Sequence, residues 1–518
     1  MTPNPGRERR DRLDRRRDNL RGTLRDTLLY IPGSVVPAVL SAVYVAVFTR
    51  LFDEKAFGRY SLVFSTCMLV VYLGSGWISH SILRYQPRYD VEGRRNVFVA
   101  GVLRLAAVFI SLLALPPLIV GILARSWLGL WSSYICAGSV LVAGLSAYIV
   151  VKSIGQAERH SAGVSAAQIA FSVLRIGFAL GLVLLVSRNA VWLIAGPAVA
   201  YLVVTPPMFV KFGLLRALRA AREADRPKLA RQFAVYGLPL VGRIASERIL
   251  GTSDRYVIEW FRGSADVGMY SASYNVAAMA MWLVVSPVLN ASYPVLTREW
   301  EGGGRPGVPG LISSYTRYFI LGAIPLVAFI AAASHDIAAL ILGEAFWPGH
   351  VVMPWIAGGA VLLHAGFFGD RGLYLREKVY RLLGAISVCA VANVGLNVVL
   401  VPRMGYRGAA IATLLSSGLY PAIVAYSSRR ELPWHVPWRS VSRAAFAGAL
   451  AWGVMNGLGG VTSHWNVLWR LALTGCVGLV AYAAVLFATK ELTLREMRLL
   501  YRYGRGQRAG GPGEKHYE

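Results

Sequence analysis

The stretch Val97–Ala124, VFVAGVLRLAAVFISLLALPPLIVGILA, decides the class of the fold. It is apolar almost throughout and carries a single charged residue, Arg104. A helix needs about 20 mostly apolar residues to cross a hydrocarbon core about 30 Å thick. The stretch therefore predicts a membrane-spanning helix with one arginine inside it.

Similar runs recur along the whole chain. The predicted spans lie at about 27–49, 59–83, 97–124, 127–151, 163–187, 189–210, 233–261, 267–297, 312–333, 351–370, 382–401, 407–427, 444–461 and 467–489. The run at 233–261 is the most polar, with five charged residues between Arg243 and Arg255. Because the runs are continuous rather than short alternating strands, helix is the spanning element. The sequence predicts an all-α membrane protein with 14 transmembrane helices.

The charge of the chain fits this topology. Of its 518 residues 55% are hydrophobic and 16% are charged, and the formal net charge is +27. With both ends placed in the cytoplasm, inner segments carry 40 Lys and Arg residues and outer loops carry nine. The positive-inside rule predicts such a bias, so topology explains the basic composition and no nucleic-acid partner is needed.

Several chemistries have no signal in the sequence. The four cysteines lie in apolar runs without CxxC spacing, and the eight histidines are scattered, so neither a disulfide framework nor a metal site is expected. No P-loop is present, which argues against ATP-driven pumping by this chain. The longest predicted outer loop, 334–350, is too short for an external catalytic domain. We expect that the protein is not an enzyme and that it holds no cofactor.

The predicted spans group as six, six and two. The expected segments are a disordered basic cytoplasmic tail (1–26), an N-terminal six-helix lobe (27–210), an amphipathic cytoplasmic linker (211–232), a C-terminal six-helix lobe (233–427), two extra transmembrane helices (428–490) and a cytoplasmic tail (491–518). Gly58-Arg59-Tyr60-Ser61 and Gly268-Met269-Tyr270-Ser271 follow the first span of each lobe. Matching positions of one motif favour two pseudo-symmetric lobes, a known transporter plan.

Polar side chains form stripes on some spans. Ser165, Gln168, Ser172 and Arg175 follow one another at helical steps, and Asn393 and Asn397 are similarly spaced on a later span. Asn275 belongs to a stripe of the eighth span. Such stripes serve either close helix packing or the wall of a hydrated cavity, and the arginine at the end of the first stripe favours the cavity.

Charges inside predicted spans are the most informative feature. An Arg or Asp at a helix centre costs about 2.5–3.5 kcal/mol on insertion scales, so it usually faces a cavity or a partner. Arg104 and Arg175 have no acid within one helical turn, which leaves either a binding role or snorkelling toward headgroups. The planar fork of arginine suits phosphate because it binds two oxygens at once.

The seventh span carries its own set of charges. Arg243 and Glu247 are four residues apart, as are Arg255 and Glu259, and Arg248 and Asp254 lie between them. This spacing allows internal salt bridges that let a polar helix insert. The alternative is that Arg243, Arg248 and Arg255 bind pyrophosphate, with Glu247 and Asp254 as candidates for ion coupling or charge pairing.

Three stretches of the chain resemble one transporter family. FTRLF at 48–52 and FGRYS at 57–61, then DRYVI at 254–258 and VGMYS at 267–271, and above all NVGLNVVLVPRMGYRGAAIATLLS at 393–416 are similar to bacterial polysaccharide-repeat flippases. These transport O-antigen or exopolysaccharide units and belong to the multidrug/oligosaccharidyl-lipid/polysaccharide exporter superfamily. The charged seventh span departs from the family pattern.

The resemblance implies two six-helix lobes whose cavity opens alternately to each side of the bacterial cytoplasmic membrane. The implied substrate is an undecaprenyl-pyrophosphate-linked oligosaccharide, with Arg104, Arg175, Arg243, Arg248 and Arg255 toward the pyrophosphate and Ser165, Gln168, Ser172, Asn275, Asn393 and Asn397 toward the sugars. The sequence leaves open whether transport is coupled to H⁺ or Na⁺. The implied partners are membrane lipids and polysaccharide polymerase or export machinery. The alternatives are a lipid II flippase or multidrug antiporter on the same fold, a membrane-embedded sugar polymerase or glycosyltransferase, and an assembly scaffold.

Overall fold

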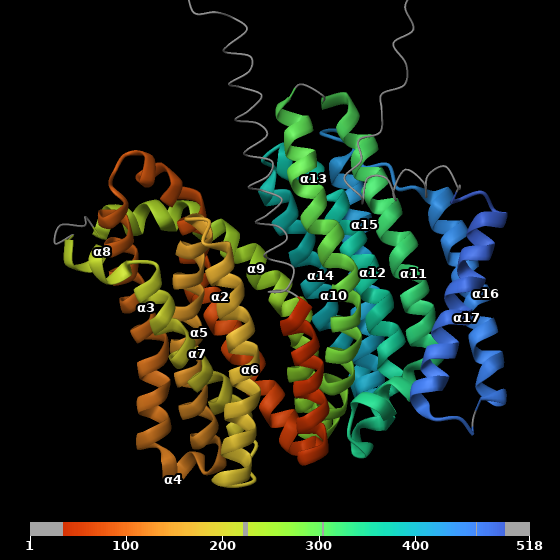
Figure 1. Ribbon diagram of the computed structural model, residues 1–518, viewed down its shortest axis with the longest axis horizontal. Coiled ribbons are helices and arrows are strands. Elements are labelled where there is room, and N and C mark those ends of the chain that lie inside the picture. Colours follow the sequence, from red (N-terminus) through yellow and green to blue (C-terminus); the bar gives the residue numbers. More distant parts are fainter. Residues whose placement is uncertain (1–34, 221–225, 303–304, 463, 493–518) are drawn as a thin grey trace, which may run out of the picture. The chain divides into compact units, whose positions relative to one another are not determined.

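The computed structural model describes residues 35–220, 226–302, 305–462 and 464–492, and every regular element in these ranges is a helix (Figure 1). The predicted tail 1–26, residues 27–34 of the first predicted span, residues 221–225 of the linker and the predicted tail 491–518 apart from residues 491–492 lie outside this part of the chain. The helices are Val35–Leu51, α2 (Glu54–Val91), α3 (Arg95–Leu123), α4 (Arg125–Leu128), α5 (Leu130–Ala157), α6 (Ser161–Leu185), α7 (Trp192–Lys211), α8 (Leu214–Ala220), α9 (Arg226–Arg262), α10 (Ser264–Glu301), η1 (Arg305–Gly307), α11 (Val308–Ile341), η2 (Glu344–Val352), α12 (Met353–Gly369), α13 (Arg371–Leu375), α14 (Val379–Met404), α15 (Tyr406–Ser428), α16 (Trp438–Val461) and α17 (Val467–Ala488).

Most of these helices can cross a membrane. Eleven helical segments of the described residues are long and apolar enough, and each of the fourteen predicted ranges overlaps a helix of the described residues. The chain is thus an all-α, multi-pass membrane protein, while the number fourteen stays a prediction. Apart from the short helices α4 and α8, the helices outside the eleven are Val35–Leu51, which is shorter, α9, which carries the five charges, and α16. The predicted outer loop 334–350 is largely helical, because α11 runs to Ile341 and η2 begins at Glu344.

The described residues fold as two units, which we treat separately. Unit 1 takes the residues up to Met279 together with Ile341–Val352 and Val379–Ser416, and unit 2 takes Ala280–Leu340, Met353–Lys378 and the residues from Ser417 onward. The lobes 27–210 and 233–427 were predicted from a repeated motif. Grouping by contacts does not test whether the two halves repeat one structure, so the lobes stay a prediction. The grouping places α9 and α14 in the same unit as α2.

In unit 1, α5 packs against α2, α3 and α7, and α6 packs along α7 (Figure 1). The side chains at these contacts are apolar or small and polar, and Ser79 of α2 is hydrogen-bonded to Ser153 of α5 at 2.6 Å. Helices in a membrane associate through such close packing and hydrogen bonds rather than through a hydrophobic driving force. Within the predicted linker, α8 buries Leu214 and Ala217 while Arg216 is exposed, as expected of an amphipathic helix. α9 packs along both α2 and α14.

The two copies of the Gly-x-Tyr-Ser motif contact one another in unit 1. A Cβ atom on Gly58 of α2 would lie 1.8 Å from the carbonyl oxygen of Ser264, and one on Gly268 of α10 would lie 2.0 Å from the carbonyl oxygen of Glu54. Only glycine allows backbone to approach so closely. The motif that the sequence singled out is therefore the place where the first turns of α2 and α10 meet.

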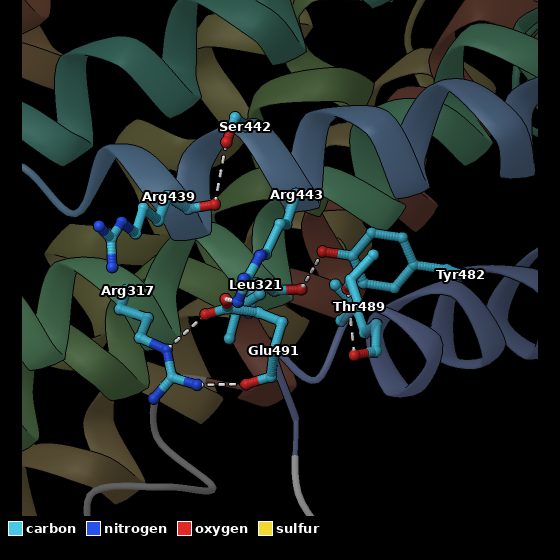
Figure 2. A network of polar contacts seen from close by, with 9 residues as sticks. Arg317, Leu321, Arg439, Ser442, Arg443, Tyr482, Thr489 and Glu491 are labelled. Carbon is cyan, nitrogen blue, oxygen red and sulfur yellow. Dashed lines mark hydrogen bonds and ion pairs between the residues drawn. The ribbon is translucent and has the colours of Figure 1, made fainter.

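In unit 2, the hairpin of α16 and α17 is joined to α11 near both ends of that helix. Arg470 pairs with Asp336, and at the other end Glu491 accepts bonds from Arg317 Nε (2.7 Å) and Arg443 Nη1 (3.0 Å), as Figure 2 shows. Arg317 and Asp336 are about 28 Å apart along α11 at 1.5 Å per residue, close to the thickness of a hydrocarbon core. The two ion pairs therefore suit the two faces of the membrane.

Glu491 lies just beyond the end of α17 and is 4% exposed. Burial opposes its ionisation, but bonds from Ser440, Arg317 and Arg443 outweigh burial and lower the pKa of Glu491 below its ordinary value. The carboxylate is therefore charged at neutral pH and holds together residues of α11, α16 and the end of α17 (Figure 2).

Candidate substrate-binding site

All thirteen residues predicted to bind substrate or to couple ions belong to unit 1. Arg104 is on α3, Ser165, Gln168, Ser172 and Arg175 are on α6, Arg243, Glu247, Arg248, Asp254 and Arg255 are on α9, Asn275 is on α10, and Asn393 and Asn397 are on α14. Arg104 is half-buried. The structure arranges the others in three groups, around Arg175, around Arg248 and around Asp254.

Arg175 projects from α6 toward the helix Val35–Leu51. Its Nη2 donates to Ser41 Oγ at 2.5 Å, and its guanidinium lies 5.2 Å from the ring centre of Tyr44 and 5.7 Å from that of Phe171. A cation over an aromatic face gains about 0.5–2 kcal/mol, depending on desolvation. These contacts hold the half-buried guanidinium against protein side chains, which favours the binding hypothesis over snorkelling along lipid.

Arg248 and Arg243 lie on α9 and face different partners. The Arg248 guanidinium is stacked 4.0 Å from the ring centre of Tyr72 on α2, and Arg248 is half-buried. Arg243 contacts Glu247 at 3.4 Å, which is the i,i+4 pair that the spacing allows. Since Glu247 is 39% exposed at its side chain, this pair is worth little on its own.

The second i,i+4 pair that the spacing allows does not form. Glu259 instead accepts a hydrogen bond from Ser264 Oγ at 2.8 Å. Arg255 turns toward α10, where its Nε donates to Ser271 Oγ at 3.1 Å and its guanidinium lies 4.8 Å from the ring centre of Tyr274. The reason is that α10 offers a hydroxyl and an aromatic face to a side chain that is almost fully buried.

Asp254 is fully buried beside this arginine. Its Oδ2 accepts hydrogen bonds from Tyr270 Oη and from Thr413 Oγ1, the latter at 3.1 Å. Its Oδ1 is also buried, and the described residues supply it with no hydrogen-bond donor. A buried carboxylate oxygen without a donor is costly, so this atom is a place where a proton or a cation could bind.

The two asparagines of α14 continue the same polar network. Asn393 Oδ1 accepts from Ser253 Oγ at 2.9 Å, and its Nδ2 donates to Ser416 Oγ at 3.1 Å. Asn397 Nδ2 donates to the carbonyl of Asn393 at 2.9 Å. Both side chains are buried, so in this conformation they join α9, α14 and α15, and their role in sugar binding stays a prediction.

The remaining predicted sugar-binding residues differ in burial. Ser165 and Ser172 are buried, and Ser172 Oγ donates to the carbonyl of Gln168 at 2.8 Å, which favours helix packing for these two serines. Gln168 and Asn275 are half-buried and remain available to a ligand. Within the described ranges, no group of three or more His, Cys, Asp or Glu side chains is arranged to hold a metal ion.

Sequence reasoning missed the aromatic partners of the arginines. Tyr44 and Tyr274 supply rings to Arg175 and Arg255, yet neither belongs to a polar stripe. Tyr72 lies in the second predicted span on one face with Ser61, Ser65, Ser75 and Ser79, and it is the ring under Arg248. A tyrosine within an otherwise apolar span was the available signal, because its hydroxyl needs a polar neighbour.

Comparisons with known proteins agree on the fold. The profile of the family described as "Polysaccharide biosynthesis protein" matches residues 23–300. The probable low-salt glycan biosynthesis flippase Agl15 of Haloferax volcanii is 26% identical over 202 residues, which are 38% of this chain and 43% of that relative. The match thus spans less than half of the relative's length.

Two solved structures show the same fold over most of the chain. The lipid II flippase MurJ in an inward closed conformation superposes with a TM-score of 0.71 at 12% identity, covering 89% of this chain and 98% of MurJ. An inward-facing multidrug resistance MATE family transporter of the MOP superfamily gives a TM-score of 0.64 at 16% identity, covering 76% of this chain and 93% of that one. The fold is therefore that of MurJ and of this MATE family transporter.

Proposed function

The chain belongs to the polysaccharide biosynthesis protein family, and from this premise we propose that it is a flippase that moves a lipid-linked oligosaccharide across the cytoplasmic membrane by alternating access. We propose an undecaprenyl-pyrophosphate-linked repeat unit as the substrate and polysaccharide biosynthesis as the pathway. The family match and the shared fold support the proposal. Its named relatives are flippases and transporters rather than enzymes, which agrees with the absence of a catalytic motif in the sequence.

One observation carries the proposal: Arg175 and Arg248 are each held on an aromatic ring and are only half-buried. Stacking fixes the plane of a guanidinium while it leaves N–H donors at its edge for a ligand. An arginine whose plane is fixed loses less entropy when it binds phosphate. Two such side chains suit the two phosphates of a pyrophosphate, and Gln168, which is half-buried on the same helix as Arg175, suits sugar hydroxyls.

The balance of charge favours an anionic substrate over cationic drugs. The assigned residues include five arginines, while the acids are Glu247, which contacts Arg243, and Asp254, which is buried. A binding site for cations would expose acids instead. A lipid II flippase is the second candidate, because the superposition with MurJ covers 98% of that protein and because lipid II also carries a pyrophosphate. The substrate that accumulates in a deletion strain distinguishes the two.

We assign ion coupling to Asp254. Its Oδ1 is buried and lacks a donor among the described residues, whereas its Oδ2 is held by Tyr270 and Thr413. Binding of H⁺ or Na⁺ would remove the cost of that unpartnered oxygen. Because Asp254 and Arg255 are adjacent on α9, a change in the charge at Asp254 would alter the environment of an arginine assigned to substrate.

The test is transport by the purified full-length protein in vesicles that contain a fluorescent lipid-linked oligosaccharide. Arg175→Ala and Arg248→Ala should each lower the rate about tenfold to a hundredfold, since each loses a charge-assisted contact of roughly 1.5–3 kcal/mol. Arg429→Ala is the matched control, because Arg429 also lies over a tyrosine, Tyr426 at 5.4 Å, but is exposed and belongs to unit 2.

The same variants are then expressed in a deletion strain. Arg175→Ala should insert normally into the membrane, abolish polymer export and trap lipid-linked repeats inside the cell. Single repeats that collect outside the cell would indicate a polymerase instead, and unimpaired export by both arginine variants would indicate a scaffold. Either of these results would contradict the proposed transport role.

A further inference from the structure

A basic pocket of about 510 Å³ lies in unit 1, away from the arginines assigned above. It is formed where α2 ends and near the start of α9, in segments that the charge bias places in the cytoplasm. Its volume falls within the range of about 300–1,000 Å³ that is typical of small-ligand sites. The residues that matter for its chemistry are Tyr85, Arg88, Tyr89, Glu92, Arg94 and Arg231.

Two tyrosines of the pocket are fixed by buried aromatic neighbours. The Tyr85 ring stacks on Phe233 with 6.0 Å between centroids and 15° between planes, and the Tyr89 ring lies 4.6 Å from Phe98. Phe233 and Phe98 are themselves buried and 5.9 Å apart. Tyr89 Oη also donates a hydrogen bond to Gln232 Oε1 at 3.4 Å. These contacts hold the aromatic side of the pocket in place.

The charges that line the pocket are unbalanced. Among its lining residues Glu92 is the single acid, and it is bonded to Arg88 at 2.9 Å. Arg94 and Arg231 therefore supply the surplus positive charge, and the Arg94 guanidinium lies 5.8 Å from the ring centre of Tyr89. The positive-inside rule accounts for arginines in these segments, but it does not account for a hollow with an ordered aromatic side beneath them.

We propose that this basic pocket binds the phosphate group of an anionic ligand. Arginine matches phosphate oxygens with two parallel N–H donors, and the stacked tyrosine rings give this wall of the pocket a fixed shape. Two arginines with surplus charge suit a pyrophosphate or a phosphate diester. The pocket is a second site beyond the one assigned to transport, and binding there requires no translocation.

Calorimetric titration with inorganic pyrophosphate tests the pocket, using the full-length protein in nanodiscs of phosphatidylcholine. The double variant Arg94→Gln/Arg231→Gln should bind about a hundredfold more weakly, roughly tenfold or 1.4 kcal/mol per arginine. Arg429→Gln should bind like the wild type, because it removes another exposed arginine that lies over a tyrosine but does not line this pocket. Matching thermal unfolding curves show that the variants are folded.

Arg175→Ala separates this inference from the proposed function. This variant should still bind pyrophosphate at the pocket even where transport is lost. The transport proposal and the pocket proposal can therefore fail independently, and the two failures are distinguishable. Wild-type affinity in the double variant, or no binding of pyrophosphate to the wild-type protein, would overturn the inference.

A second arm identifies where the phosphate comes from. Nanodiscs that contain phosphatidylglycerol present a membrane headgroup, and nanodiscs that contain a polyprenyl pyrophosphate present a carrier lipid. If membrane lipid is the source, phosphatidylglycerol should weaken pyrophosphate binding to the wild type, and mass spectrometry should find less of it retained by the double variant. If the carrier lipid is the source, only polyprenyl pyrophosphate should compete. Both results support a phosphate site and assign its ligand.

Discussion

Replacing Glu491 by Gln should loosen the hairpin of α16 and α17 from α11. The carboxylate is 4% exposed, and its two oxygens bind Arg317 at 2.7 Å and Arg443 at 3.0 Å (Figure 2). An amide keeps the shape but loses the charge, and it turns an NH₂ group toward one of the two guanidinium groups. The substitution therefore leaves two arginines facing a neutral group.

The expected cost follows from the exposure of each arginine. A hydrogen bond to a charged group contributes about 1.5–3 kcal/mol. Arg317 is 22% exposed at its side chain and should keep most of that value, whereas Arg443 is 42% exposed and solvent reduces its share to that of a surface pair, about 0–1 kcal/mol. The total loss of unfolding free energy should be roughly 2–3 kcal/mol.

The loss should depend on pH in a defined direction. Because the bonds of Glu491 lower its pKa in the folded protein, its contribution is complete above the usual glutamate pKa of about 4.3. It is lost as the pH falls from there through the lower pKa of the folded state. The wild type should therefore lose its advantage over Glu491→Gln in acid, whereas at pH 7 the difference should be full.

Thermal and denaturant unfolding of the detergent-solubilised protein measures this difference. Limited proteolysis between α15 and α16 reports directly on release of the hairpin. Glu299→Gln is the matched control, because Glu299 is exposed and lies in the same unit. Equal stability of Glu491→Gln and wild type at pH 7, or a difference that persists unchanged in acid, would refute the reasoning.

Three further changes test other parts of the structure. Gly58→Ala forces a Cβ to within 1.8 Å of a backbone oxygen and should cost about 1–3 kcal/mol of unfolding free energy, whereas Gly181→Ala, which has open space, should cost nothing measurable. Tyr72→Leu and Arg248→Gln in a double-mutant cycle of stability should show a coupling of about 0.5–2 kcal/mol, and additive effects would argue against the stacked pair. Asp254→Asn keeps an acceptor for Tyr270 Oη and should fold, but transport should no longer depend on a proton or sodium gradient; retained dependence would exclude Asp254 as the coupling residue.

The apolar runs predicted the helices well because length and hydropathy alone decide which segments can cross a bilayer. The stretch 97–124, for instance, forms α3 from Arg95 to Leu123. The positions of Gly58 and Gly268 were also visible as a repeated motif. Their direct contact was not, since a sequence repeat does not say whether its copies meet.

The side-chain geometry of the site was harder to predict. The i,i+4 rule predicted the contact between Arg243 and Glu247. It failed for Arg255, because the buried guanidinium contacts a hydroxyl and an aromatic ring on the next helix instead of the acid on its own helix. The basic pocket was hidden for a related reason. Arg94 and Arg231 belong to different segments and read as ordinary cytoplasmic charge until the fold brings them to one hollow.

At Gly58 and Gly268 the backbones of α2 and α10 are in direct contact, so a tilt of α2 relative to α10 would turn about this first turn of α2. Phe57 packs against Phe346 beside this contact, and α3, α5 and α9 pack along the rest of α2, so a tilt of α2 would have to be taken up by these neighbours. From Gly58 to Val91 is about 50 Å at 1.5 Å per residue, so a tilt of about 5° would swing the far end by roughly 4 Å. That far end carries Arg88 and Tyr89, and so a motion too small to notice at one surface of the membrane would reshape the basic pocket at the other.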